Sequence, residues 1–232
     1  MRHTAHGKHQ AGFSIMELLV AMTVMIVITG AATTLLVSAF NVRSREDNRS
    51  EAISDARRAL NIITREVANS GYQLPRGLTY TSSGVTKPVP VNGLLAEDCD
   101  ATSLTFVANL NAQGEIDYPA SPQSNSIGDG IEDEAVKFQL VQSGGNSFLV
   151  RRDLNTGNSL VLANRIDGAR FDYLNAMGND TSGNLAAAVS VRLTVWVTMN
   201  PVGKPGDVGY QAPAQVNLSS LINLRNAHLQ NY

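Results

Sequence analysis

One uninterrupted apolar block limits what this chain can fold into. The block runs from Phe13 to Phe40 and carries a single charged side chain, Glu17, whereas the residues on both sides are polar and freely charged. A helix over this block rises about 42 Å, and the hydrocarbon core of a bilayer is about 30 Å thick. The block therefore predicts one membrane-spanning helix, and the rest of the chain has to fold outside the lipid.

The segment before the block indicates how the chain is oriented. Residues 1–12 are polar, contain two basic residues and three histidines, and end in a glycine directly before the apolar block. A secretory signal peptide has the opposite order, with its apolar region before the cleavage site. Basic residues favour the cytoplasmic side of a span, so we expect a cytoplasmic N-terminus and an external C-terminal part. Arg43, Arg45 and Arg49, just beyond the far end, weigh against this orientation.

Glu17 is costly in this position, because a carboxylate stranded in lipid costs about 2.5–3.5 kcal/mol. Two interpretations are open. In the first, Glu17 reaches the headgroups and the helix is an ordinary anchor. In the second, which we favour, Glu17 pairs with a positive charge from a neighbouring chain. If the bond after Gly12 is cut, the new amine of Phe13 lies about one helical turn from Glu17 and supplies such a charge.

The segment from Gly12 to Val20, GFSIMELLV, resembles the class III leader and cleavage motif of type IV pilins and of type II secretion pseudopilins. The resemblance is strong over residues 7 to 40. It implies that a prepilin peptidase cleaves between Gly12 and Phe13 and methylates the new amine of Phe13. It also implies that Glu17 acts in filament assembly.

Residues 41–70 predict a continuation of the same helix, because they are rich in Arg, Glu, Ala and Leu and contain no proline or glycine. An apolar stripe with helical spacing runs along this segment: Ile53, Ala56, Leu60, Ile63 and Val67. The stripe packs either against the chain's own sheet, which we favour, or against neighbouring subunits. Ser70-Gly71, followed by Pro75, indicates the end of the helix.

Two further segments resemble one subgroup of these proteins. Residues 55–72, DARRALNIITREVANSGY, are similar to the corresponding part of PilW-type minor pilins and of related GspJ-type minor pseudopilins, and SLINLRN at 220–226 resembles the closing strand of that group. Two features favour a minor over a major subunit. The chain is large for a main subunit even after loss of the leader, and a single cysteine, Cys99, cannot form the disulfide loop common in major pilins.

After Gly71 the apolar pattern changes from helical to alternating, which is typical of strands. Positions 189–198 predict a long strand, and 136–140 with 148–150 predict a hairpin around Gly144-Gly145. Further strand candidates are 160–162, 169–173 and 216–224, and polar loops are expected at about 111–130, 175–186 and 200–213. The expected fold class is α+β, with a long N-terminal helix packed on an antiparallel sheet. The expected segments are a leader (1–12), a transmembrane and assembly helix (13–40), an amphipathic extension (41–70) and an extracytoplasmic β-rich head (71–232).

Composition argues against catalysis. Only His228 remains once the leader is removed, which leaves little material for a Ser-His-Asp triad or a multi-histidine zinc site. The acidic run from Asp129 to Glu134 could offer calcium ligands through Asp129, Glu132 and Asp133, but it lacks the EF-hand spacing and we interpret it as a solvated turn. The net charge of −2 argues against a nucleic-acid partner. We expect neither an enzyme nor a cofactor.

The expected function is that of a minor type IV pilin, a processed membrane-inserted subunit that primes, caps or modulates pilus assembly. The alternatives are a type II secretion minor pseudopilin, an adhesive or DNA-uptake tip module, and a plain membrane-anchored binding protein. The resemblance implies as partners the prepilin peptidase, other minor and major pilins or pseudopilins, and the inner-membrane assembly platform. The expected location is the inner membrane, with a single span and a periplasmic head, and then the pilus or pseudopilus.

Overall fold

The computed structural model describes residues 13–74, 79–82, 85–109, 135–206 and 210–227. The chain divides into two compact units. One, called here the stalk unit, holds the N-terminal part of the long helix up to Glu46 together with Pro201–Ala212. The other, the head unit, holds Asp47–Asn200 and the chain from Pro213 onward.

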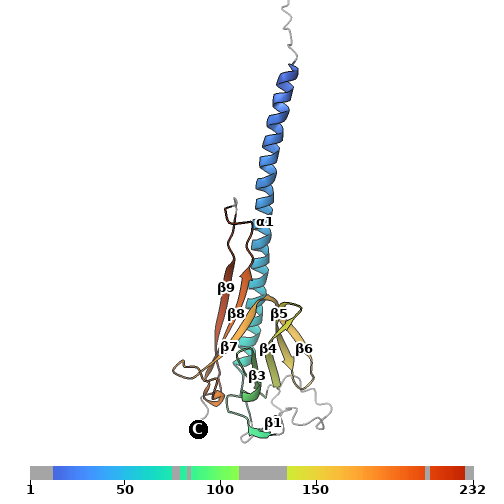
Figure 1. The fold of residues 1–232 in the computed structure, drawn as a ribbon. Coiled ribbons are helices and arrows are strands. Elements are labelled where there is room, and N and C mark those ends of the chain that lie inside the picture. The colour runs from blue at the N-terminus through green and yellow to red at the C-terminus, as the bar shows by residue number, and fades with distance from the viewer. Residues whose placement is uncertain (1–12, 75–78, 83–84, 110–134, 207–209, 228–232) are drawn as a thin grey trace, which may run out of the picture. The chain divides into compact units, whose positions relative to one another are not determined.

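Helix α1 (Ile15–Val67) is 53 residues long and runs without interruption through the apolar block and its polar continuation (Figure 1). Threonine hydroxyls inside the block donate back to main-chain carbonyl oxygens of the preceding turn, for example from Thr33 to Thr29 and from Thr34 to Ala31, both at 2.8 Å. These bonds satisfy the hydroxyls inside the helix, which an apolar environment requires. The long N-terminal helix expected from the sequence is thereby confirmed.

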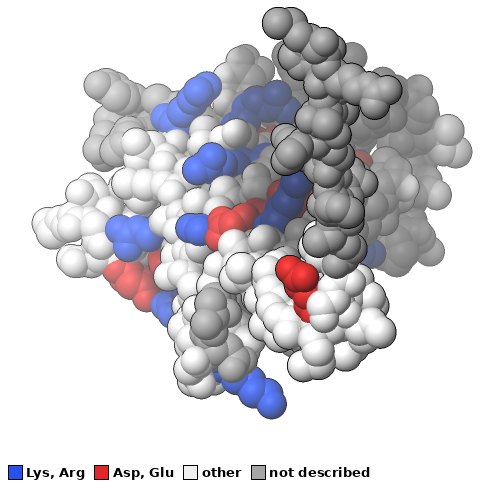
Figure 2. Space-filling model, turned by 90° about the horizontal axis from the view of Figure 1, so that it is seen from above, with Lys and Arg blue, Asp and Glu red and all other residues white. Residues whose placement is uncertain are grey.

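The part of α1 in the stalk unit presents its large apolar side chains outward, and Ile15 and Phe40 are 80% and 59% exposed. By length and composition, α1 is able to cross a membrane. Figure 2 looks onto the N-terminal end of this helix. The visible helix surface there is uncharged except for acidic side-chain atoms, drawn in red. Glu17 is the one charged residue between Phe13 and Phe40. This surface needs lipid or apolar protein around it.

The described part of the head unit contains three antiparallel sheets and two short 3-10 helices, η1 (Ala96–Asp98) and η2 (Leu185–Ala187). The larger sheet has the order β3-β4-β5-β6, the second has the order β7-β8-β9, and the smallest joins β1 to β2. The bounds of the strands are β1 Thr79–Ser82, β2 Val85–Pro88, β3 Ser103–Val107, β4 Ala135–Ser143, β5 Asn146–Asp153, β6 Ser159–Ile166, β7 Gly168–Leu174, β8 Ser190–Met199 and β9 Ala214–Asn223. The α+β class is confirmed, but the expectation of one sheet is wrong. Only Asp167 separates β6 from β7, and β7 pairs with β8 instead of β6.

The predicted strands and hairpin are present. Ser143 pairs with Asn146, and Gly144 and Gly145 between them have φ values of 59° and 80°. Both are left-handed, as a two-residue turn that matches the twist of its strands requires. The long strand expected at 189–198 is β8, and it pairs with β9 along its whole length without a shift in register. The expected loop at 111–130 lies outside the described residues.

One hydrophobic core joins α1 to both of the larger sheets within the head unit. The helix contributes a face that contains three alanines, so the sheets approach its backbone closely. The core members are Ala52, Ala56, Ala59, Leu60, Ile63 and Val67 of α1, with Leu104, Phe106, Phe138 and Leu149 of the first sheet and Phe171, Leu193, Val195 and Ile222 of the second. Phe106 and Phe138 stack with ring centroids 6.2 Å apart. Such burial is the main source of stability in a head of this size.

The end of α1 is held by a buried junction of main-chain and small polar groups. The Ser70 hydroxyl donates to the carbonyl of Asn92 at 2.5 Å, and the Asn92 amide donates to the carbonyls of Leu185 and Ala188 at 2.7 and 3.0 Å. The amide of Gly71 donates to the carbonyl of Val107 at 2.9 Å. The junction therefore joins the helix end to β3 and to the segment that leads into β8.

A glycine at position 93 makes this close approach possible. A Cβ atom on Gly93, where φ is +73°, would lie 2.3 Å from the amide nitrogen of Gly71 and 2.5 Å from the carbonyl oxygen of Val107. Gly157 has nearly the same φ of +74°, but a Cβ atom there would meet nothing within 4 Å. The positions Gly93 and Gly157 thus share the same backbone strain and differ in the space around them.

We expect Gly93→Ala to lower the free energy of unfolding of the head by about 2–5 kcal/mol, because it adds a backbone clash to the strain of a left-handed alanine. Gly157→Ala, the matched control, should cost only about 1–2 kcal/mol. Urea unfolding of the full chain in detergent, followed by the fluorescence of its single tryptophan, measures both. Equal losses for the two variants would show that the junction is not tightly packed.

Candidate functional site at the N-terminal end of the helix

The sequence-predicted processing site adjoins the first turn of α1. Gly12 lies outside the described residues, and Phe13 precedes the helix with its side chain exposed. The hydroxyl of Ser14 accepts a hydrogen bond from the amide of Met16 at 3.3 Å, and its carbonyl accepts from the amides of Glu17 and Leu18 at 3.0 and 3.1 Å. Ser14 is therefore the N-cap of the helix.

This cap places Glu17 at the third position of the helix. Ser14 and Glu17 have the S-x-x-E spacing of a capping box, in which the acid faces back toward the N-terminus. The partial positive charge of the helix N-terminus favours a carboxylate in this first turn. Sequence reasoning singled out Glu17 but missed Ser14, although the spacing was readable. The first turn of α1 therefore carries one carboxylate, four residues after Phe13 in the sequence.

The predicted packing stripe faces the head's own sheets. Ala56, Ile63 and Val67 are fully buried, Leu60 is nearly so, and Ile53 is half-buried. Sequence reasoning missed Ala52 and Ala59, which are buried on the same face. The chain's own core thus occupies most of the stripe.

Polar contacts beside the stripe fix the helix against both sheets. The carboxylate of Glu66 accepts from the guanidinium of Arg151 on β5 at 2.8 Å, and the side chains involved are 20% and 15% exposed. Thr64 and Ser220, on β9, form a hydroxyl–hydroxyl hydrogen bond of 3.1 Å. A further ion pair joins Glu51 to Arg165 on β6. None of these pairs is visible in the sequence, because the two partners of each pair lie far apart along the chain.

Comparisons with known proteins identify the N-terminal segment. Residues 7–33 match the prokaryotic N-terminal methylation motif. Among solved structures, the chain is similar to a type IV-like pilin from Thermus thermophilus, with 10% sequence identity, a TM-score of 0.39, and coverage of 75% of this chain and 97% of that chain. A search of curated protein sequences finds no match.

The acidic run 129–134 contains the residues that the sequence offers as weak candidates for metal ligands. The candidates Asp129, Glu132 and Asp133 lie outside the described residues. In the part of the chain that the structure describes, no group of three or more His, Cys, Asp or Glu side chains could hold a metal ion.

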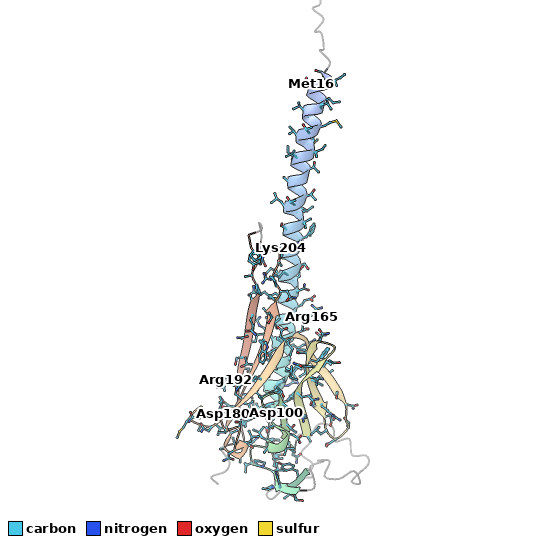
Figure 3. All side chains as sticks on the ribbon, in the orientation of Figure 1. Met16, Asp100, Arg165, Asp180, Arg192 and Lys204 are labelled. Atoms are coloured by element: carbon cyan, nitrogen blue, oxygen red, sulfur yellow. The ribbon has the colours of Figure 1, made fainter. Side chains whose placement is uncertain are left out.

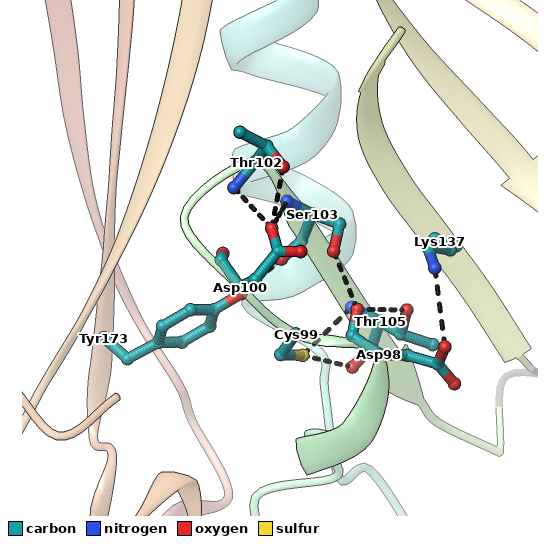
Figure 4. Close-up of polar contacts among 8 residues, drawn as sticks. All are labelled: Asp98, Cys99, Asp100, Thr102, Ser103, Thr105, Lys137 and Tyr173. Atoms are coloured by element: carbon teal, nitrogen blue, oxygen red, sulfur yellow. Dashed lines mark hydrogen bonds and ion pairs between the residues drawn. The ribbon is translucent and has the colours of Figure 1, made fainter. Parts of the chain in front are cut away.

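A second polar cluster lies between η1, β3 and β7 in the head unit (Figure 4). The thiol of Cys99 donates to the carbonyl of Thr105 at 3.3 Å and accepts from the Thr105 amide at 3.2 Å. The Tyr173 hydroxyl donates to the carbonyl of Ser103 at 2.7 Å. The carboxylate of Asp100 accepts from the amides of Thr102 and Ser103 at 2.6 and 2.7 Å. The cluster closes the turn that leads into β3.

The pKa shifts in this cluster follow from burial and from the hydrogen bonds just described. Burial raises the pKa of the Cys99 thiol to about 11, so the thiol stays protonated at neutral pH and is a poor nucleophile. Burial, together with nearby Cys99 and Asp100, also raises the pKa of Tyr173. For Asp100, partial burial raises the pKa, but hydrogen bonds from Thr102 and Ser103 outweigh it and the net pKa is lowered. The Asp100 carboxylate therefore stabilises the fold at neutral pH, and this contribution is lost as pH falls through its lowered pKa.

We expect Cys99 to react with thiol reagents at pH 8 about a hundredfold more slowly in the folded chain than after denaturation, because little thiolate forms at a pKa of about 11. The rate should rise with pH up to about that value. Alkylation that is stopped at timed intervals, followed by intact mass spectrometry, measures this rate. Rapid labelling of the folded chain would contradict the burial of this thiol.

Proposed function

We propose that the chain is a minor type IV pilin, processed at the membrane by a prepilin peptidase and then incorporated into a filament. The observation that carries this proposal is the methylation motif at residues 7–33, which continues directly into the 53-residue helix α1. Peptidase cleavage between Gly12 and Phe13 leaves an amine on Phe13 at the start of that helix. Methylation of this amine keeps its positive charge.

Exposed apolar surface on α1 supports an assembly role. The side chains from Phe13 to Phe40 are not part of the head's own core, because this part of the chain lies in the stalk unit. In the membrane, lipid covers them. In a filament, the apolar helices of neighbouring subunits replace the lipid, and the cost of leaving Glu17 among them is offset by the Phe13 amine of a neighbour.

The head supports a binding role over a catalytic one. Its buried ionisable groups hold the fold together, and charges beside the helix are paired across to the sheets. We therefore assign the chain a non-enzymatic role in which it primes, caps or modulates pilus assembly, with the head on the periplasmic side before assembly. Its partners are the prepilin peptidase, other minor and major pilins, and the inner-membrane assembly platform.

A minor rather than a major subunit is favoured by the length of the chain, which stays large for a main subunit once the leader is lost. The single cysteine agrees, because it cannot close a disulfide loop within the chain. The resemblance of residues 55–72 and 220–226 to PilW-type minor pilins points the same way. A GspJ-type minor pseudopilin of a type II secretion system is the alternative in the same class, because it shares the same leader, helix and processing.

We expect cleavage at Gly12 only when a prepilin peptidase is co-expressed, with loss of residues 1–12 and addition of one methyl group to Phe13. Gly12→Val should leave the chain intact, because it removes the glycine that precedes the cut in the motif. Gly7→Val, a glycine substitution within the leader, is the matched control and should still be cleaved. Intact mass of the purified chain reads all three. An uncut wild-type chain in the presence of active peptidase would overturn the proposal.

We expect Glu17→Val to reduce incorporation into filaments at least tenfold, because breaking a buried ion pair costs roughly 3–5 kcal/mol. Ser14→Ala is the control, since it removes the helix cap but keeps the carboxylate, and it should assemble nearly as the wild type does. Quantitative immunoblots of sheared filaments, normalised to the membrane-bound pool, measure incorporation. Normal incorporation of Glu17→Val would remove the pairing role from Glu17.

A further inference from the structure

In the connection between β8 and β9, Gln211 and Ala212 bond to α1 close to the end of the apolar block. The guanidinium of Arg45 donates to the side-chain oxygen of Gln211 at 2.5 Å and to the carbonyl of Ala212 at 2.8 Å. Val202 and Gln211 form an antiparallel bridge that closes the tip of the loop. All of these residues belong to the stalk unit. Figure 3 shows Lys204 at this tip, alongside α1.

The spacing along the helix sets the depth of this contact in a membrane. Arg45 follows Phe40, the last residue of the apolar block, by five positions, which corresponds to a rise of about 7.5 Å. The polar headgroup layer adds about 5–8 Å on each side of the hydrocarbon core. A helix that spans the bilayer with Phe40 at the hydrocarbon boundary therefore places Arg45 and the loop that it holds at the level of the lipid phosphates.

The chemistry of the tip suits that layer. Both acceptors of Arg45 are uncharged oxygens, so these bonds position the guanidinium without cancelling its positive charge. Lys204 is exposed on the same tip, and half-buried Tyr210 brings the kind of aromatic ring that favours membrane interfaces. Basic side chains at a bilayer surface attract anionic phospholipids, with about a fivefold gain in binding for each one.

We propose that residues 201–206 and 210–212, together with Arg45, form a lipid-binding tip that contacts the phosphates of anionic phospholipids on the outer face of the inner membrane. Before assembly, the tip fixes the height of the chain in the bilayer. This inference rests on the membrane insertion in the proposed function. A tip that only braces the helix, or that contacts a neighbouring subunit, would show no dependence on lipid charge.

The test places a fluorophore on the tip of the full-length chain in vesicles. Ala212→Cys supplies the attachment site, because this side chain is exposed and only its main-chain carbonyl bonds to Arg45. The natural thiol, Cys99, reacts slowly at neutral pH, because burial raises its pKa to about 11. Met177→Cys, 86% exposed in the head unit, provides the control label. The vesicles contain phosphatidylcholine, either alone or mixed with phosphatidylglycerol. Both kinds also contain a lipid with a spin label on its headgroup, and the readout is quenching of the fluorophore by this spin label.

We expect the tip label to be quenched several-fold more strongly than the control label, and more strongly in vesicles that contain phosphatidylglycerol. Arg45→Gln combined with Lys204→Gln should abolish the extra quenching due to phosphatidylglycerol. Arg58→Gln is the control variant, because it removes an arginine of α1 that is 67% exposed and paired with Asp55. It should leave the extra quenching due to phosphatidylglycerol unchanged.

The outcomes separate the two proposals. Equal quenching of the two labels, or quenching that ignores both phosphatidylglycerol and the double substitution, would overturn the lipid-binding tip while leaving the pilin assignment intact. A chain that does not float with vesicles in a density gradient would overturn membrane insertion, and the lipid-binding tip with it.

Discussion

The structure depends on one helix that buries two different surfaces in two different surroundings. Between Ala52 and Val67, α1 buries a narrow face against two sheets, and its alanines let those sheets come close to the helix backbone. Between Phe13 and Phe40, the same helix has apolar side chains on its whole circumference and has to bury them in lipid or against other subunits. The first surface holds the head together as one chain. In the proposed function, the second surface makes the chain a subunit of a filament.

Polar groups determine how firmly the head is attached to this helix. Beside the helix end, Ser70 donates to the carbonyl of Asn92, and the Asn92 side chain donates to the carbonyl of Leu185. Unpaired, such buried groups would cost about 1–3 kcal/mol each. The bond between Glu66 and Arg151, both largely buried, adds a charged contact to β5. These contacts attach the sheets to the part of α1 that belongs to the head unit.

Sequence reasoning predicted the parts of the fold that have a local signal. The helix is marked by its composition and by the absence of proline, the β4–β5 hairpin by Gly144-Gly145, and β8 by its alternation. It missed β3, because every residue of that strand is buried and no alternation of apolar and polar residues remains. It also merged the two larger sheets into one, because strand pairing joins residues that lie far apart in the sequence. At the site, Gly12, Phe13 and Glu17 form a local motif. The contact between Arg45 and Gln211 joins positions far apart in the chain, so only the folded chain brings it together.

We propose that this chain is cut after Gly12 and enters a filament through the helix that begins beside the new amine of Phe13. The most direct measurement is the N-terminal peptide mass of the chain recovered from filaments sheared from cells, compared with that in the membrane fraction. We expect the filament-bound chain to begin at methylated Phe13. A filament-bound chain that still begins at Met1, or a processed chain that stays in the membrane and never enters filaments, would contradict it.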